Sequence, residues 1–163
     1  MSRPAFLFSV LLLIAAAACS SVQASKVLKC KGSSIDVTNK VRISVCEEPP
    51  CQLRKRAVPE IRIAFRPDHD INNLVTSVQA QIGGIPFPFI GVDGTSACGK
   101  LFKSDGKTKA DCPLKKGQDY FYVNSFKVYD QYPKVKLHIR WALRDPNANK
   151  MVSCFELPAK ITN

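Results

Sequence analysis

The chain has 163 residues, with 24 Lys or Arg against 13 Asp or Glu, and a formal net charge of +11. This length suits one domain behind a leader, with a core that buries about two-thirds of the unfolded surface. The positive charge favours anionic partners such as lipid headgroups, bacterial envelope or nucleic acid, although a basic exported protein need have none. Only two histidines occur, and no nucleophile motif surrounds any serine, so we expect no enzyme and no cofactor.

The N-terminus has the features of an export signal. A single charge, Arg3, precedes a nearly unbroken apolar run over residues 6–18, which is too short to span a membrane. Residues 22–24 then offer the small side chains that a signal peptidase reads. We therefore predict a signal peptide over residues 1–24 and a mature domain over residues 25–163. A lipoprotein anchored at Cys19 is the alternative, but the residues before it match that motif poorly.

The mature domain contains an even set of six cysteines. Such a set in an exported chain is typical of a disulfide framework, so we expect no free thiolate for catalysis or metal binding. The six are Cys30, Cys46, Cys51, Cys98, Cys112 and Cys154.

Hydrophobic residues alternate with polar ones through most of the mature chain, which predicts β-strands. In one strand Ile61, Ile63 and Phe65 share a face, and in another Trp141 lies on an apolar face while His138 points outward. Turn residues separate these stretches at short intervals, which favours an all-β sandwich of two sheets. The space between the sheets could be an ordinary core or a cavity for an apolar ligand. The predicted strands are 41–45, 61–65, 77–82, 120–123, 137–143 and 152–161.

Basic residues gather in two places, at residues 54–56 and between the fourth and fifth cysteines of the mature domain. The second group is either a docking surface for anionic membranes or a solvated loop; it contains Lys100, Lys103, Lys107 and Lys109. Neither group carries the interleaved aromatic residues that stack on bases, so we do not expect nucleic acid as a partner. Asp68, His69 and Asp70 resemble a metal cluster, but they follow a proline in a polar turn, and we predict a solvated loop without metal.

Several short motifs, in the same order and with six matching cysteines, resemble the Niemann–Pick type C2 group of the ML lipid-recognition domains. The similarity covers residues 30–161, and the arthropod members look closest. The motifs lie at residues 48–53, 85–88, 112–114, 132–133, 139–143 and 154–158.

The resemblance implies an immunoglobulin-like sandwich with a lipid pocket between its sheets. It also implies the disulfides Cys30–Cys154, Cys46–Cys51 and Cys98–Cys112. Independently, Pro86 and Pro88 are expected to stop their strand and leave Phe87 at the rim of the pocket. Pro59 stands where the sterol carriers have an aromatic residue, so the wall should differ there. The candidate lipid-binding residues are Ile63, Phe65, Ile85, Phe87, Val128, Tyr132, Pro133 and Trp141.

We therefore expect a secreted or endolysosomal, monomeric carrier of sterol or a related hydrophobic lipid. Recognition of bacterial envelope lipids in innate immunity and carriage of semiochemicals are alternatives within the same class. A cationic surface-interaction protein with a filled core is the alternative from another class. The chain has no N-x-S/T sequon, so nothing in it supports sorting to the lysosome through an N-glycan.

Overall fold

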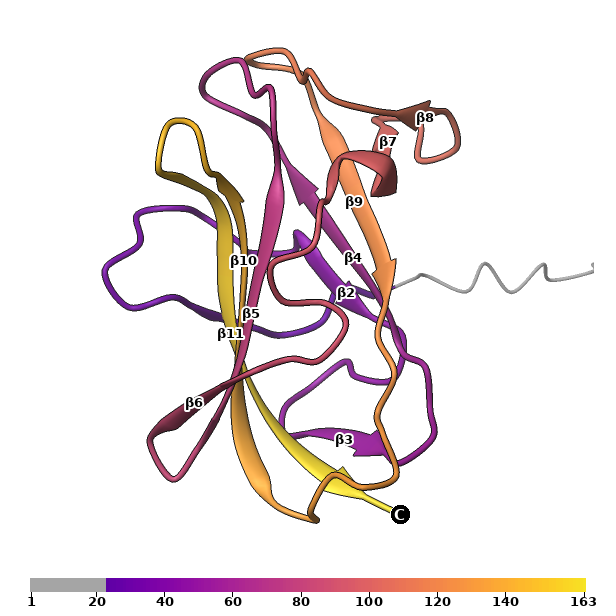
Figure 1. The fold of residues 1–163 in the computed structure, drawn as a ribbon. Coiled ribbons are helices and arrows are strands. Elements are labelled where there is room, and N and C mark those ends of the chain that lie inside the picture. The colour runs from indigo at the N-terminus through magenta and orange to yellow at the C-terminus, as the bar shows by residue number, and fades with distance from the viewer. Residues whose placement is uncertain (1–22) are drawn as a thin grey trace, which may run out of the picture.

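The structure is a computed structural model that describes residues 23–163, and the expected signal peptide lies outside this range except for its last two residues. Two β-sheets face each other (Figure 1). The first contains β1 (Leu28–Lys29), β11 (Lys150–Thr162), β10 (Lys136–Asp145), β5 (Val75–Ile82) and β6 (Ile85–Pro88) in that order, with β3 (Cys51–Arg54) also paired to β11. The second contains β2 (Val41–Ile43), β4 (Glu60–Phe65), β9 (Tyr120–Ser125), β7 (Leu101–Lys103) and β8 (Lys109–Ala110). The predicted all-β sandwich is confirmed.

The central strands follow the alternation of the sequence. In β4, Ile61, Ile63 and Phe65 are buried, while the residues between them are only partly covered. In β10, Trp141 is 2% exposed and His138 is exposed, as predicted. Because successive side chains of a strand point to opposite faces, each sheet turns one apolar face inward, and these faces form a single core.

β11 is the longest strand and has neighbours on both edges. β10 pairs with it antiparallel over nearly its full length, from Lys136 opposite Lys160 to Asp145 opposite Lys150. On the other edge, β1 pairs with the middle of β11 and β3 runs parallel to its end. The C-terminal strand therefore joins two elements from the first third of the chain to the strand that directly precedes it.

Three disulfides join the pairs that the resemblance implied. Cys30–Cys154 ties the chain next to β1 to β11, with Cα atoms 5.7 Å apart. Cys46–Cys51 closes the turn before β3, and Cys98–Cys112 closes the loop that carries β7 and β8. Within residues 23–163 the one helix is the 3₁₀ turn η1 (Cys98–Lys100), so the described chain has no helix of the length and apolarity needed to cross a membrane.

The segment Ile85–Pro88 differs from the prediction. The prolines do not stop the strand, since this segment pairs with β5 and Phe87 lies opposite Ala80. Proline has no backbone N–H, but in an antiparallel pair only every second residue donates to the neighbouring strand, and Pro86 and Pro88 occupy the positions in between. β6 is also an edge strand, where proline is tolerated. Phe87 nevertheless keeps 47% of its surface exposed, as expected of a residue at a rim.

Candidate functional site

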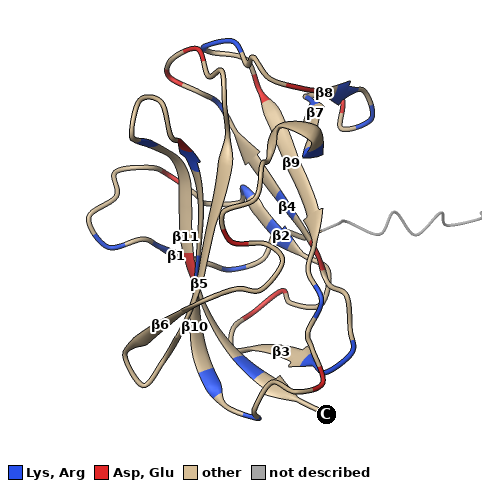
Figure 2. Cartoon of the chain, in the orientation of Figure 1, with Lys and Arg blue, Asp and Glu red and all other residues tan. Residues whose placement is uncertain are grey.

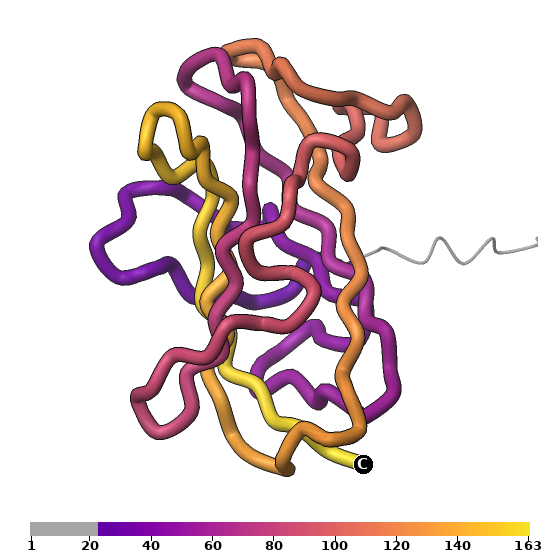
Figure 3. The backbone as a smooth tube through the Cα atoms, in the orientation of Figure 1, coloured from indigo at the N-terminus to yellow at the C-terminus, as the bar shows by residue number. Residues whose placement is uncertain are grey.

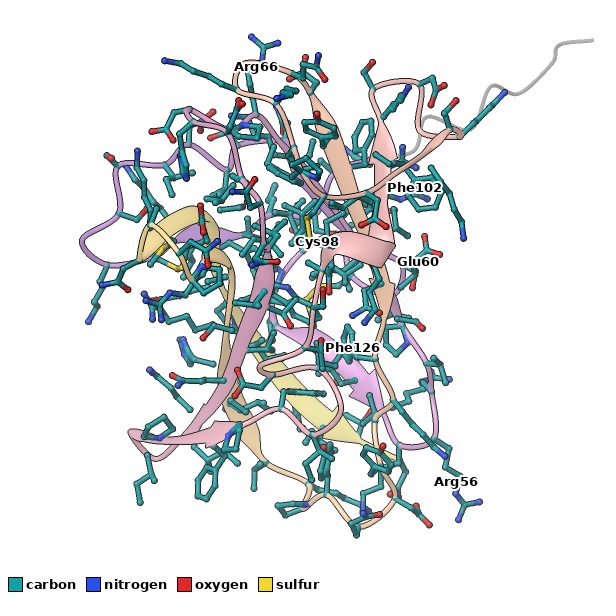
Figure 4. All side chains as sticks on the ribbon, turned by 45° about the horizontal axis from the view of Figure 1, so that its top comes forward. Arg56, Glu60, Arg66, Cys98, Phe102 and Phe126 are labelled. Carbon is teal, nitrogen blue, oxygen red and sulfur yellow. A yellow bond between two sulfur atoms is a disulfide. The ribbon has the colours of Figure 1, made fainter. Side chains whose placement is uncertain are left out.

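A row of aromatic side chains runs from the surface near β6 into the space between the sheets. Tyr129 contacts Tyr132 with ring centroids 5.6 Å apart, and Tyr132 contacts Phe89 at 6.0 Å. Phe89 meets Phe126 edge to face at 5.4 Å, and Phe126 lies 5.6 Å from Trp141. Figure 4 shows Phe126 among the side chains that fill the interior. We call these five residues the aromatic row; it is the continuous apolar connection between the surface and the middle of the sandwich.

Two irregular segments carry most of the aromatic row. After β6, the chain crosses from the first sheet toward the segment that leaves β9 (Figure 3), and Phe89 is fixed there because its N–H donates to the carbonyl of Val78 at 2.9 Å. After β9, Val128 donates to the carbonyl of Ala57 at 3.0 Å and accepts from Arg56 at 2.7 Å. Backbone hydrogen bonds therefore hold both segments in place, the first to β5 and the second to the connection between β3 and β4.

The predicted site residues fall into two groups. Ile63, Phe65, Val128 and Trp141 are buried between the sheets, with at most 6% of each exposed. The others lie at the surface or partly at it: Ile85, Phe87 and Pro133 are exposed, and Tyr132 is half-buried.

Sequence reasoning missed Phe89 and Phe126, which connect the two groups. Both lie just after a strand, where alternation no longer says which way a side chain points. The one available indication was composition, because each is a large aromatic residue.

Side chains fill the space between the sheets at the aromatic row. Ile63, Val78 and Tyr122 have no exposed surface, which leaves no room for a lipid beside them in this conformation. The pockets found within residues 23–163 open on the outer surface of the sandwich instead. One of about 320 Å³ lies at the turn between β5 and β6 and is lined in part by Lys136, His138 and Lys160.

Basic residues surround the end of the sandwich that carries β6. Lys136 and Lys160 lie directly opposite each other on neighbouring strands, and Arg54 ends β3 nearby (Figure 2). Like charges directly opposite are unfavourable in a sheet, so an anion would relieve their repulsion. The loop with Lys103, Lys107 and Lys109 lies with β7 and β8 at the other end of the molecule (Figure 1).

The polar turn around His69 is more ordered than the prediction of a solvated loop. Its Nδ1 lies 2.6 Å from Asp68 and its Nε2 lies 3.0 Å from Asp145, which is buried at the end of β10. These hydrogen bonds, that of Asp68 first, raise the pKa of His69. Lys150 holds the pKa of Asp68 down to about 2. Both ring nitrogens are thus engaged by carboxylates, and the solvated-loop prediction is wrong for His69.

A second cluster of possible metal ligands also has a structural explanation. Cys98 and Cys112 lie close to the carboxylate of Asp111. The two sulfur atoms are bonded to each other, so neither is a thiolate that could bind a metal ion.

The ML domain family matches residues 24–161 of this chain. The chain is 32% identical over 160 residues to NPC intracellular cholesterol transporter 2 of Mus musculus, covering 97% of this chain and 99% of that protein. It is 31% identical to NPC intracellular cholesterol transporter 2 homolog a of Drosophila melanogaster, covering 80% and 83%. The crystal structure of a Niemann-Pick type C2 protein from Japanese carpenter ant superposes with a TM-score of 0.63 at 26% identity, covering 85% and 96%.

The fold and the length of these matches define an ML domain, and the chain belongs to the ML domain family. Within that family the resemblance to the Niemann–Pick type C2 group is confirmed. Its placement among arthropod members stays a prediction.

Proposed function

We propose that this protein binds sterol or a related hydrophobic lipid between its two sheets and carries it between membranes. The observation that supports this most directly is the aromatic row, which leads from the exposed rim at β6 to the buried Trp141. The names of the relatives in Mus musculus and Drosophila melanogaster, cholesterol transporter 2 and its homolog, agree with a sterol. We further propose export to the extracellular space or the endolysosomal lumen.

Binding by this route requires the sheets to open, because side chains fill the space between them. Burying roughly 400 Å² of hydrocarbon yields about 10 kcal/mol at 25 cal/mol/Å². The lost freedom of ligand and protein reduces this to an affinity in the micromolar to nanomolar range. Apolar burial alone therefore suffices, and no catalytic group is required.

The rim also has the properties of a membrane-docking surface. Ile85, Phe87 and Ile90 expose between 47% and 61% of their surfaces at the end that also carries Lys136 and Lys160. Exposed apolar side chains insert into an interface, while lysines are attracted to anionic headgroups. Docking at this rim would place the outer end of the aromatic row against the membrane that supplies the lipid. Docking through the loop of β7 and β8 would instead leave the aromatic row facing away from the membrane.

The filled interior favours a second candidate function, that of a cationic surface-interaction protein with no lipid inside. Two experiments distinguish a lipid carrier from a surface-interaction protein: lipid extraction with mass spectrometry of natively purified protein, and titration with a fluorescent sterol. We expect about one lipid per chain and saturable sterol binding. An envelope lipid or a semiochemical in the extract would assign the alternative ligands instead. Protein that is free of lipid and does not bind the sterol would overturn the proposal.

A further inference from the structure

Two arginines face each other on the outer side of the second sheet. Arg42 of β2 lies directly opposite Arg62 of β4, and both side chains reach solvent. Like charges in this position repel each other. Neither arginine belongs to an ion pair among residues 23–163. This pair is therefore available to an anion from outside the chain.

Arg62 is held in a defined position. Its Cζ lies 4.0 Å from the ring centroid of Phe121 on β9, a distance at which a guanidinium and an aromatic ring attract each other. The guanidinium also reaches the turn between β7 and β8, where a Cβ atom on Gly106 would lie only 2.2 Å from Nη2. Glycine at this position leaves room for the side chain. A positioned arginine binds a partner at a lower cost in conformational entropy than a mobile one.

A pocket of about 240 Å³ lies beside the two arginines. Three basic side chains and one aromatic ring contribute to its wall: Lys40, Arg42, Arg62 and Phe121. Lys40 also pairs with Asp36 at 3.3 Å, but 44% of its side chain stays exposed. The pocket is thus large enough for one tetrahedral anionic group and is surrounded by positive charge.

The same outer face continues across the sheet to Lys109 of β8. Lys109 lies opposite Phe102 of β7, which in turn lies opposite Phe121. We call Lys40, Arg42, Arg62 and Lys109 the basic face, and Figure 2 shows the basic residues on β2, β4 and β8. Glu60 is the one acidic residue in the five strands of this sheet. Since neighbouring strands lie about 4.8 Å apart, the four steps from β2 to β8 cover roughly 20 Å.

We propose that the basic face binds a sulfated polysaccharide chain that crosses the strands of the second sheet. The planar fork of arginine matches the paired oxygens of a tetrahedral anion such as sulfate. Clusters of basic residues are a known feature of heparin-binding surfaces. A span of several strands allows successive sulfate groups of one chain to meet the two arginines and the lysines on either side of them.

Two other polyanions fit this face less well. Membrane docking uses exposed apolar side chains, and those of residues 23–163 lie outside the five strands of this sheet. They are Leu28, Val45, Val58, Ile85, Phe87 and Ile90. Single-stranded nucleic acid needs open aromatic rings for stacking, and Arg62 covers the ring of Phe121.

This inference goes beyond the proposed function and does not depend on it. The rim at β6 belongs to the first sheet, whereas the basic face belongs to the second. A protein held on a sulfated polysaccharide by the basic face would keep that rim free. Retention outside the cell and exchange of a lipid would then use different surfaces of one domain.

The test measures the affinity for heparin, a sulfated polysaccharide, by calorimetry at physiological ionic strength. Changing both Arg42 and Arg62 to Gln should lower this affinity about tenfold or more, because hydrogen bonds to charged groups are lost. Lys136→Gln with Lys160→Gln is the matched control. It removes the same charge from the directly opposed pair of the first sheet and should change the affinity by less than about twofold. Changing both arginines to Lys keeps the charge, and the affinity should still fall severalfold because lysine lacks the planar fork.

Three results would overturn the inference. The first is that the parent protein does not bind heparin. The second is that the control loses as much affinity as the Arg42 and Arg62 variant, which would show that binding follows net charge alone. The third is unchanged heparin affinity in that variant. If the same variant failed to bind phosphatidylserine vesicles, the basic face would instead be a membrane-docking surface. Sterol titration of the same variants reports separately on the proposed function.

Discussion

Phe89 and Phe126 meet edge to face with ring centroids 5.4 Å apart, and they join the two sheets of the sandwich. Phe89 follows β6 in the first sheet, and Phe126 follows β9 in the second. Edge-to-face contacts of this kind add about 0.5–1.5 kcal/mol to the burial of the rings. Under the proposed function, this contact would have to separate, at a moderate cost, for a lipid to enter between the sheets.

Replacing Phe87 or Phe89 by Ala should affect sterol affinity and folding stability differently. Phe87→Ala should weaken sterol binding by about 1–3 kcal/mol, since the ring is half exposed at the rim and available to the ligand. Its effect on the free energy of unfolding should be small. Phe89→Ala is the matched control: this ring is 5% exposed, and its loss should destabilise the fold by about 3–5 kcal/mol. Sterol titration measures the affinity, and chemical denaturation measures the free energy of unfolding. A large loss of stability in Phe87→Ala would contradict the placement of Phe87 at a ligand-binding rim.

The lysines beside the rim should govern transfer to anionic membranes. Each lysine near such a surface contributes about 1 kcal/mol, so changing Lys136 and Lys160 to Gln should weaken vesicle binding about tenfold or more. The effect should fade in high salt, where the Debye length falls to ~3 Å. Changing Lys100, Lys103, Lys107 and Lys109 to Gln removes twice the charge from the opposite end and should have the smaller effect. The reverse order would assign docking to the loop of β7 and β8.

The three disulfides should differ in their contribution to stability. Cys30–Cys154 spans 124 residues and Cys46–Cys51 spans 5, so chain-entropy estimates give about 5 and 2 kcal/mol. Replacing both cysteines of each pair by Ser and measuring denaturant midpoints tests this order. Equal losses for the two double variants would show that loop length does not set their contribution.

The hydrogen bonds of His69 to Asp68 and Asp145 should make stability depend on pH. The pKa of His69 is raised in the folded protein, so its contribution is full below the unfolded value of about 6.5 and is lost as pH rises through the folded value. Asp68 and Asp145 have lowered pKa values and stay charged throughout this window. His69→Gln should therefore cost about 1–2 kcal/mol at pH 5 and less at pH 8. A constant difference between the two proteins from pH 5 to pH 8 would disprove the coupling.

Alternation predicted the long strands because each contains enough residues to show a period. β4, β5, β10 and β11 all fall where the sequence placed them, although the structure extends their ends. β1, β7 and β8 have two or three residues each, too few for any period, and backbone pairing to longer neighbours defines them instead.

The candidate site was less accessible to prediction than the fold. The alternation of its strand placed Trp141 on an apolar face, and the family resemblance made it a candidate. Phe89 and Phe126 lie in irregular segments, where no alternation helps. The partner of His69 could not be found from local sequence, because Asp145 is 76 residues away in the chain. Such contacts depend on how the sheets close over each other, which no short pattern encodes.

The position of β11 determines the order in which the molecule can assemble during synthesis. β2, β4, β7, β8 and β9 precede it in the chain, so the second sheet can form before the last residues emerge. β1, β3 and the thiol of Cys30 must wait, since their partners all lie in β11. Because chains are made at about 5–20 residues per second and begin to fold as they emerge, Cys30 cannot form its native disulfide until Cys154 has been made. Until then, Cys30 has to be kept from pairing with Cys46 or Cys51, which appear long before Cys154.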